Sequence, residues 1–203
     1  MVRTLALLSA IALAACSPAD QDAPQPLPDG TWQLAADQSR VAFVSVKGGD
    51  VGEAHSFRTL GGTVAPDGTV ALTIDLASVQ TGIDVRDQRM RDMLFEVASF
   101  PQAKLGAKID PAALTALKPG ERKAMNLPVT VDLHGTINTI EARLMVTRLD
   151  GDSVLVETAA PLIIDASAVG LGEGVEKLRA VANLPAISAA VPVTASLLFT
   201  PQD

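Results

Sequence analysis

The chain has 203 residues, of which 48% are hydrophobic and 3% aromatic, and its formal net charge is −7. Its charges are scattered and form no basic face for phosphates, so we expect no nucleic-acid partner. With a single cysteine the chain can form no internal disulfide, and its stability must come from a hydrophobic core.

The first residues, MVRTLALLSAIALAAC, have the layout of a secretory signal, with Arg3 followed by an apolar run from Leu5 to Ala15. The run is about half of the roughly 20 residues that a membrane span needs, so we expect residues 1–15 to be cleaved. The letters LAAC resemble the bacterial lipobox, which implies acylation of the Cys16 thiol and attachment to a membrane. A plain signal peptide with an incidental cysteine is the alternative.

Residues 16–30 contain four prolines among small and acidic residues, a composition that cannot build a core. We expect an extended tether that could hold a domain as far as about 40 Å from a membrane. Ser17, in the place where an inner-membrane retention signal would resemble an aspartate, favours the outer membrane. The expected location is therefore the periplasmic side of a bacterial cell envelope.

From residue 31 to residue 201 we expect one domain, in which apolar and polar residues alternate as in strands with one buried face. Residues 70–76, with the letters VALTIDL, show the pattern most clearly. Similar segments are RVAFVSV (40–46), SFRTLGGTVA (56–65), QAKLGAKI (102–109), SVLVETAAPLIID (153–165) and ISAAVPVTASLLF (187–199).

Residues 129–133 and 140–146 indicate a hairpin, with Gly135 and Asn138 as turn formers, and Asp150-Gly151 indicates a further turn. In all we count about eight strands, and few are joined by the long connections that parallel pairing requires. Such a sheet can close into a barrel, which removes its edges. Aliphatic inward positions suit a chain-like apolar guest and a fully packed interior equally well.

Between these strands, residues 84–100 have a helical pattern in which Met90, Met93, Leu94 and Val97 form one apolar stripe. Asp84 is placed to be the N-cap, and the residue before Pro101 ends the run. The stripe needs an apolar surface to cover. It either forms a flap that lines the mouth of a tunnel or completes the core without meeting a ligand.

Two further helices are expected. One begins at Asp110 as N-cap, with a proline in its first turn, and stops at Pro119-Gly120. The other covers residues 175–182 and carries its charged side chains outward.

Arg86 and Asp87, within the helical pattern, have two interpretations. Arg86 could meet an anionic headgroup, for which a guanidinium is a natural partner. Alternatively, the pair locks the start of the helix to a neighbouring strand through charge-assisted hydrogen bonds. We favour the structural interpretation because the adjacent acid would compete with a phosphate for the same donors.

Other motifs give weaker signals. GLGEGVEKL from Gly170 follows a strand, but its spacing and the absence of βαβ alternation argue against a dinucleotide site. His55 and His134 could ligate a metal or haem only as a distant pair, without a cluster of other ligands. No nucleophile elbow is present. We therefore expect no catalysis, no metal and no cofactor.

The chain from about residue 30 to residue 200 resembles the YceI-like domain family. The resemblance is carried by Trp32, then DQSRVAFVSVK, FRTLGGTV, IDLASVQTGIDVRDQRMRDMLFEVASFPQAKL, LPVTVDLHGTI and the stretch from LIIDASAVG to ASLLF. Its most specific positions are Ser78, Thr81, Arg86, Asp87, Phe95 and Pro101. The resemblance implies a mainly β protein, a lipocalin-like antiparallel barrel with short flanking helices, whose apolar tunnel holds a polyisoprenoid or similar long-chain amphiphile.

In such a tunnel, we expect a set of aromatic and aliphatic side chains to form the wall or the gate. They are Phe43, Phe57, Leu72, Ile74, Met90, Met93, Leu94, Phe95, Val97 and Phe100. Arg86 is the headgroup candidate, and Cys16 is the lipidation site.

The function that we expect is binding and sequestration or carriage of a long-chain lipid by a lipid-anchored envelope protein. One alternative is a scaffold lipoprotein with a packed barrel and a docking outer surface. Another is an accessory of electron transfer that works through a bound quinone or haem.

Overall fold

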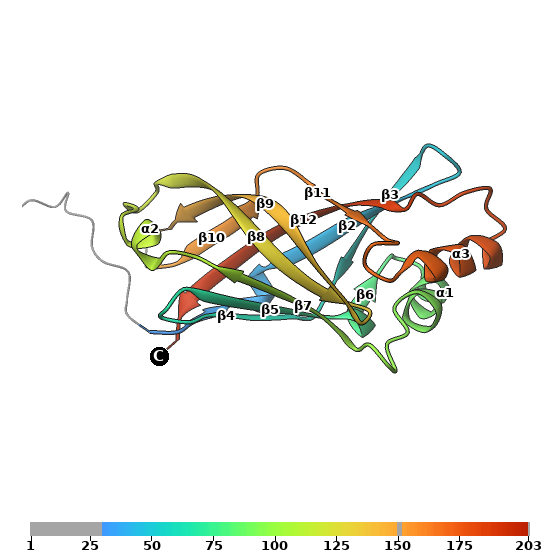
Figure 1. Ribbon diagram of the computed structural model, residues 1–203, viewed down its shortest axis with the longest axis horizontal. Coiled ribbons are helices and arrows are strands. Elements are labelled where there is room, and N and C mark those ends of the chain that lie inside the picture. Colours follow the sequence, from blue (N-terminus) through green and yellow to red (C-terminus); the bar gives the residue numbers. More distant parts are fainter. Residues whose placement is uncertain (1–29, 150–151, 203) are drawn as a thin grey trace, which may run out of the picture.

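The structure is a computed structural model that describes residues 30–149 and 152–202 (Figure 1). The predicted signal at 1–15, the lipidation site Cys16, almost all of the predicted tether and the predicted Asp150-Gly151 turn lie outside the described residues. Within the described part of the chain, no helix is long and apolar enough to cross a bilayer.

Eight strands form a closed antiparallel ring (Figure 1). In ring order they are β1 (Trp32–Leu34), β4 (Leu60–Val64), β5 (Thr69–Asp75), β7 (Gln102–Lys108), β8 (Arg122–Leu133), β9 (Thr136–Arg148), β10 (Val154–Thr158) and β12 (Ala190–Pro201). The ring closes because β1 pairs with β4 on one side and with the end of β12 on the other. The predicted antiparallel barrel is therefore confirmed.

A second set of strands extends the barrel beyond this ring. The first half of β12 pairs with β2 (Arg40–Lys47) and with β11 (Leu162–Asp165), while its second half belongs to the ring. β2 pairs in turn with β3 (Val51–Phe57), and β3 pairs with the short β6 (Val79–Gln80). The barrel is thus lengthened on the side where β12 begins.

The longest hairpin joins β8 and β9, as predicted, but its turn is shorter than we expected. Leu133 pairs with Thr136, so the turn is only His134-Gly135, with φ of 51° and 74°. Positive φ at both central residues is the requirement of the tight turn that matches the twist of the strands. Asn138 is not a turn residue: it lies within β9, and its side chain donates to the Ala168 carbonyl.

The predicted helix at 84–100 is shorter and changes its winding. It consists of α1 (Asp84–Arg89), continued by one π-helical turn, η3 (Met90–Leu94). Ile83, in an extended conformation, is the N-cap, so Asp84 is the first helical residue instead of the cap. The chain leaves the helix well before Phe100, since Glu96 has a φ of 47°.

The other two helices lie where they were predicted, although the first of them ends at Thr115, before the predicted stop at Pro119-Gly120. Asp110 caps α2 (Pro111–Thr115) by accepting from the Ala112 amide at 3.0 Å, with the proline in the first turn. The last helix, α3 (Gly172–Val181), starts slightly earlier than expected. Short 3-10 turns, η1 (Ala36–Gln38) and η2 (Leu76–Ser78), complete the described elements.

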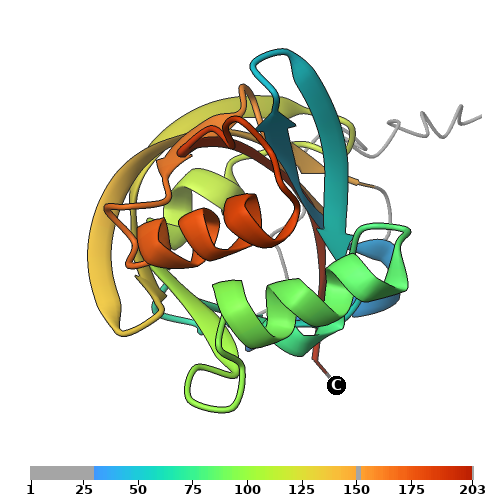
Figure 2. The same ribbon diagram turned by 90° about the vertical axis from the view of Figure 1, so that its right-hand side faces the viewer.

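The helices occupy the two ends of the barrel. In Figure 1, α1 and α3 lie at the end where β2, β3 and β6 extend the sheet, and α2 lies at the opposite end. Looking along the barrel, Figure 2 shows α1 and α3 side by side across the extended end. Most of the buried apolar side chains form one cluster inside the barrel, and a smaller cluster forms beneath α2 around Leu117.

Candidate functional site

The barrel contains two apolar cavities. The outer cavity, of about 460 Å³, lies at the end with α1 and α3. The inner cavity, of about 270 Å³, lies towards α2 and the first described residues, Gly30 and Trp32. Both are walled by inward-facing positions of the strands, where the period-2 pattern places aliphatic side chains.

The two cavities lie end to end, because five residues line both of them. These residues, which we call the waist, are Val41, Ile74, Leu105, Leu162 and Val193. On β12, Val191 lines the outer cavity and Phe199 the inner one. Eight residues at about 3.3 Å each place these two side chains about 26 Å apart along the tilted strand β12. The space is long and narrow, a shape that suits a chain.

The outer cavity opens between the two helices. Ile83, Val85 and Val181 line it and are also well exposed, at 47%, 57% and 43%. Ile83 and Val85 belong to the start of α1, and Val181 is the last residue of α3. We call these three residues the mouth. Exposed apolar side chains around an opening are typical of a binding entrance.

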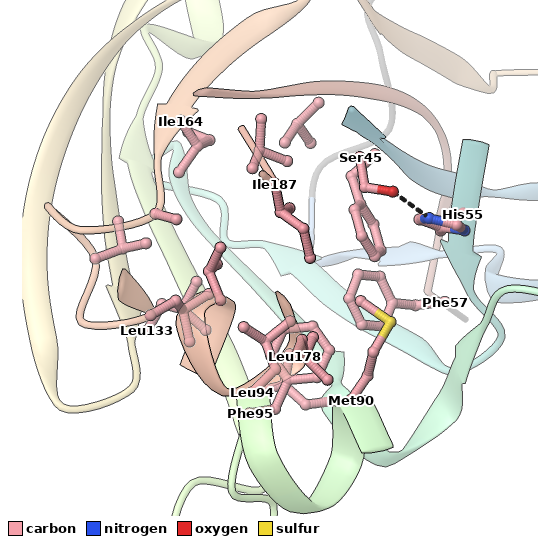
Figure 3. A pocket seen from close by; sticks show the side chains of 18 of the residues that line it. Ser45, His55, Phe57, Met90, Leu94, Phe95, Leu133, Ile164, Leu178 and Ile187 are labelled. Atoms are coloured by element: carbon pink, nitrogen blue, oxygen red, sulfur yellow. Dashed lines mark hydrogen bonds between the residues drawn. The ribbon is translucent and has the colours of Figure 1, made fainter. Parts of the chain in front are cut away.

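The segment α1–η3 supplies one side of the outer cavity. Met90, Leu94 and Phe95 line it and are buried (Figure 3). Met93 and Val97, from the same predicted stripe, do not line either cavity. The π-helical turn is the cause: because it inserts an extra residue in the turn, Leu94 and Phe95 point inward together and Met93 is rotated away from the cavity.

Phe100 lies outside both cavities. Its ring packs on that of His134 in the β8–β9 turn, with centroids 4.2 Å apart. The residue therefore anchors the loop after η3 to the hairpin.

The remaining wall candidates come from strands. Phe43 on β2 and Phe57 on β3 line the outer cavity, Leu72 lines the inner one, and Ile74 belongs to the waist. Phe43 contacts Phe57, with ring centroids 5.4 Å apart, and Phe57 contacts Phe95 at 5.8 Å. These three rings form a continuous aromatic surface from β2 to the end of η3.

Arg86 reaches the outer cavity but is engaged by protein groups. One of its terminal nitrogens donates to Glu53 Oε2 at 2.7 Å, and the other donates to the Thr81 carbonyl at 2.7 Å. Lys47 pairs with the same Glu53 oxygen at 2.8 Å. The hydrogen bonds from Lys47 and Arg86 lower the pKa of Glu53. This arrangement ties α1 to β2 and β3, which is the structural role that the sequence favoured.

Asp87 fixes the start of the same helix. Its carboxylate accepts hydrogen bonds from the Thr81 amide at 2.8 Å and from the Thr81 hydroxyl. A carboxylate that accepts from the turn before a helix satisfies donors that would otherwise lack partners. Arg86 binds the carbonyl of Thr81, and Asp87 binds its amide and hydroxyl, so the two residues together fix the start of α1 to Thr81.

His55 and Ser45 form a polar pair that the sequence analysis missed. His55 is only 3% exposed, lines the outer cavity and shares a 2.8 Å hydrogen bond between its Nε2 and Ser45 Oγ. The sequence suggested His55 as a metal ligand, and nothing in it indicated a pairing with Ser45. The signal for a place in the cavity was its position in β3, two residues from both Glu53 and Phe57, because every second residue of a strand faces the same side.

The second histidine, His134, lies at the surface turn between β8 and β9, outside both cavities. Among the residues that the structure describes, no group of three or more side chains of the usual ligating types could hold a metal ion.

Comparison with known proteins agrees with this architecture. The model of the YceI-like domain matches residues 32–199. The chain belongs to the YceI-like domain family. This confirms the resemblance found in the sequence.

Two solved structures are similar to this YceI-like domain. A polyisoprenoid binding domain from Saccharophagus degradans, implicated in plant cell wall breakdown, is 40% identical with a TM-score of 0.82, over 84% of this chain and 98% of that one. BcnA from Burkholderia cenocepacia is 20% identical with a TM-score of 0.61, over 82% and 99% of the two chains, which shows the shared fold. No similar protein was found among curated proteins.

The cavities of this YceI-like domain can exclude water from a long apolar molecule. In the outer cavity the polar lining groups are confined to a few residues, chiefly the Lys47-Glu53-Arg86 cluster and the Ser45-His55 pair. The inner cavity is lined almost wholly by apolar side chains. The arrangement therefore offers burial along its length and hydrogen bonds in one region only.

Proposed function

We propose that this YceI-like protein binds a polyisoprenoid or another long-chain amphiphile in its barrel and sequesters or carries it without catalysis. The observation that carries the proposal is the pair of apolar cavities that meet at the waist. The 40% identical relative described as a polyisoprenoid binding domain supports the same class of ligand. A fully packed barrel, the scaffold alternative, would not contain such cavities.

Affinity in such a site comes mainly from the tail. Burial stabilises by about 0.8 kcal/mol per methylene, so ten methylenes contribute roughly 8 kcal/mol before the costs of association. Polyprenyl phosphates, quinones with isoprenoid tails, and fatty acids or amides all carry tails of this kind.

The test is extraction of the purified protein with organic solvent, followed by mass spectrometry of the extract. We expect a recurrent long-chain species from the wild type and its loss from Leu94→Asp, which places a charge in the outer cavity. Met93→Asp is the matched control, since its position is adjacent in η3 but does not line a cavity. Empty wild-type extracts, together with no thermal stabilisation by added polyprenyl lipids, would refute the proposal.

We further propose that the protein works on the periplasmic side of a bacterial envelope, held by an acylated Cys16. The lipobox-like letters LAAC support this location. Cys16→Ser should leave the precursor unprocessed or release the protein in soluble form on cell fractionation. Unchanged membrane attachment of a processed Cys16→Ser protein would contradict the anchor.

A further inference from the structure

The wall of the outer cavity changes in polarity along β2 and β3. The inward-facing residues are charged near the mouth (Lys47 and Glu53), then neutral and polar (Ser45 and His55), and then aromatic (Phe43 and Phe57). The same order of residue types runs along both strands, but β3 is offset by one inward-facing position: Glu53 lies opposite Ser45, and His55 lies opposite Phe43. Each level lies about 7 Å deeper than the one before.

The middle level is a hydrogen-bonding pair in an apolar wall, formed by the half-buried Ser45 and the buried His55 (Figure 3). Ser45 Oγ and His55 Nε2 are 2.8 Å apart, and the imidazole packs against the Phe43 ring with centroids 5.1 Å apart. His55 Nδ1 is buried and has no hydrogen-bond partner among the described residues. A buried polar atom without a partner costs free energy, typically about 1–3 kcal/mol, unless another molecule supplies the bond.

The surroundings of His55 favour the neutral form of its imidazole. Burial, and secondarily the charge of Arg86, lowers the pKa of His55. A neutral imidazole has one donor and one acceptor nitrogen, and a serine hydroxyl can donate and accept. Whichever tautomer is present, the Ser45-His55 pair uses one donor and one acceptor internally, and hydrogen-bonding capacity remains for a third group.

The charged level does not favour an anion. Lys47 and Arg86 both contact the same Glu53 oxygen, so the carboxylate already balances much of their charge. A phosphate placed here would also face the Glu53 carboxylate, which lies directly across from Ser45 in the strand register.

We propose that Ser45 and His55 form a subsite for one neutral hydrogen-bonding group, a hydroxyl or carbonyl, at the end of the long-chain ligand. The tail then runs past Phe43 and Phe57 towards the waist, with the neutral head held inside the mouth. This subsite rests on the proposed function, because it requires that the barrel bind a chain. It makes the ligand a neutral amphiphile, such as a long-chain alcohol, amide or quinone, in preference to a phosphate.

The test compares three probes that share one tail: geranylgeraniol, its monophosphate and the matching hydrocarbon. Their dissociation constants are measured by displacement of a fluorescent long-chain hydrocarbon from the purified protein. The wild type should bind the alcohol about five- to tenfold more tightly than the hydrocarbon, the ratio that one net hydrogen bond provides. The phosphate should bind more weakly than the alcohol.

The variants separate hydrogen bonding from packing. Ser45→Ala and His55→Phe should each reduce the ratio of the hydrocarbon dissociation constant to the alcohol dissociation constant to less than about twofold. His55→Gln keeps a donor and an acceptor and should retain the preference. His134→Asn is the control, because it alters the other histidine, outside both cavities, at a φ of 51° that asparagine tolerates.

The possible outcomes separate an error in the subsite from an error in the proposed function. If the alcohol preference is the same in the wild type, Ser45→Ala and His55→Phe, the subsite is wrong although the barrel binds chains. Tighter binding of the phosphate than of the alcohol also overturns it. If the wild type binds none of the three probes, the proposed function itself fails.

Discussion

At the scale of single residues, Glu53 makes stability depend on pH. Hydrogen bonds from Lys47 and Arg86 lower its pKa below the ordinary 4.5. A carboxyl group whose pKa is lowered by folding stabilises the protein above its ordinary pKa, and the contribution is lost as the pH falls through the folded-state value. The free energy of unfolding should therefore decrease below pH 4.5, and Glu53→Gln should make this decrease shallower.

The measurement is denaturant unfolding at a series of pH values. At neutral pH, Glu53→Gln should lower the free energy of unfolding by less than about 1 kcal/mol, because the Glu53 side chain is partly exposed. Lys47→Met, which removes the first of the two partners, should change the curve in the same direction. If the free energy of unfolding depends on pH in the same way in the wild type and in Glu53→Gln, the Glu53 carboxylate does not contribute to the pH dependence of stability.

The residue scale is also where the sequence had least to offer. Strand alternation placed Phe43 and Phe57 on the inward face, and the cavity shows them there. It could not show that Ser45 and His55 meet, because their contact depends on the register between β2 and β3. The partner of Arg86 was equally hidden, since Glu53 lies 33 residues earlier in the chain.

At the scale of elements, α3 packs on η3 through a glycine. A methyl group on Gly174 would lie 2.8 Å from both Leu94 Cα and the Met93 carbonyl oxygen. Alanine normally stabilises a helix by up to about 1 kcal/mol relative to glycine. Here the contact is with backbone atoms, so we expect Gly174→Ala to lower the free energy of unfolding by about 1–3 kcal/mol.

Thermal or urea unfolding checks this prediction. Gly106→Ala on β7 is the matched control, because its added methyl group would meet nothing closer than 3.9 Å. Equal stability of Gly174→Ala and the wild type would mean that the two helices can separate without cost.

The helical segment shows why a periodic pattern is an incomplete guide to an element. Its spacing correctly indicated a helix that begins near residue 84 and presents Met90 and Leu94 to an apolar surface. An ideal period also placed Met93 and Val97 on that surface. The π-helical turn rotates Met93 away from the cavity, while Val97 follows the helix and packs against the core without lining the cavity. Such a turn is stabilised by tertiary packing, including that of Gly174 on Leu94, which no local pattern records.

At the scale of the whole molecule, the waist sets how long a bound chain can be. Leu105 belongs to it and lines both cavities. Leu105→Trp should block passage from the outer to the inner cavity. We expect the variant to bind short prenols as the wild type does but to lose at least about tenfold in affinity for long ones, because their extra methylenes can no longer be buried.

Titration with prenols of increasing length measures this effect, with Leu105→Met as a control of nearly unchanged volume. If affinity rises with chain length as steeply in Leu105→Trp as in the wild type, long chains do not pass the waist.

The architecture as a whole was largely predictable. Period-2 patterning and short connections indicated about eight antiparallel strands, and the need to avoid open edges indicated closure. The way in which β12 serves two sheets was not predictable, because a continuous apolar strand looks the same whether its two halves pair with the same neighbours or with different ones. That division makes the barrel long enough to hold two cavities.

The position of Gly30 has a consequence for how the protein is supplied with its ligand. Gly30 lies by the inner cavity, and the mouth lies at the other end of the barrel (Figure 1). An attachment made through the residues before Gly30 would therefore join the barrel at the end opposite the mouth. With the proposed anchor, the surface that holds the protein and the opening that exchanges ligand would then lie at opposite ends of the barrel.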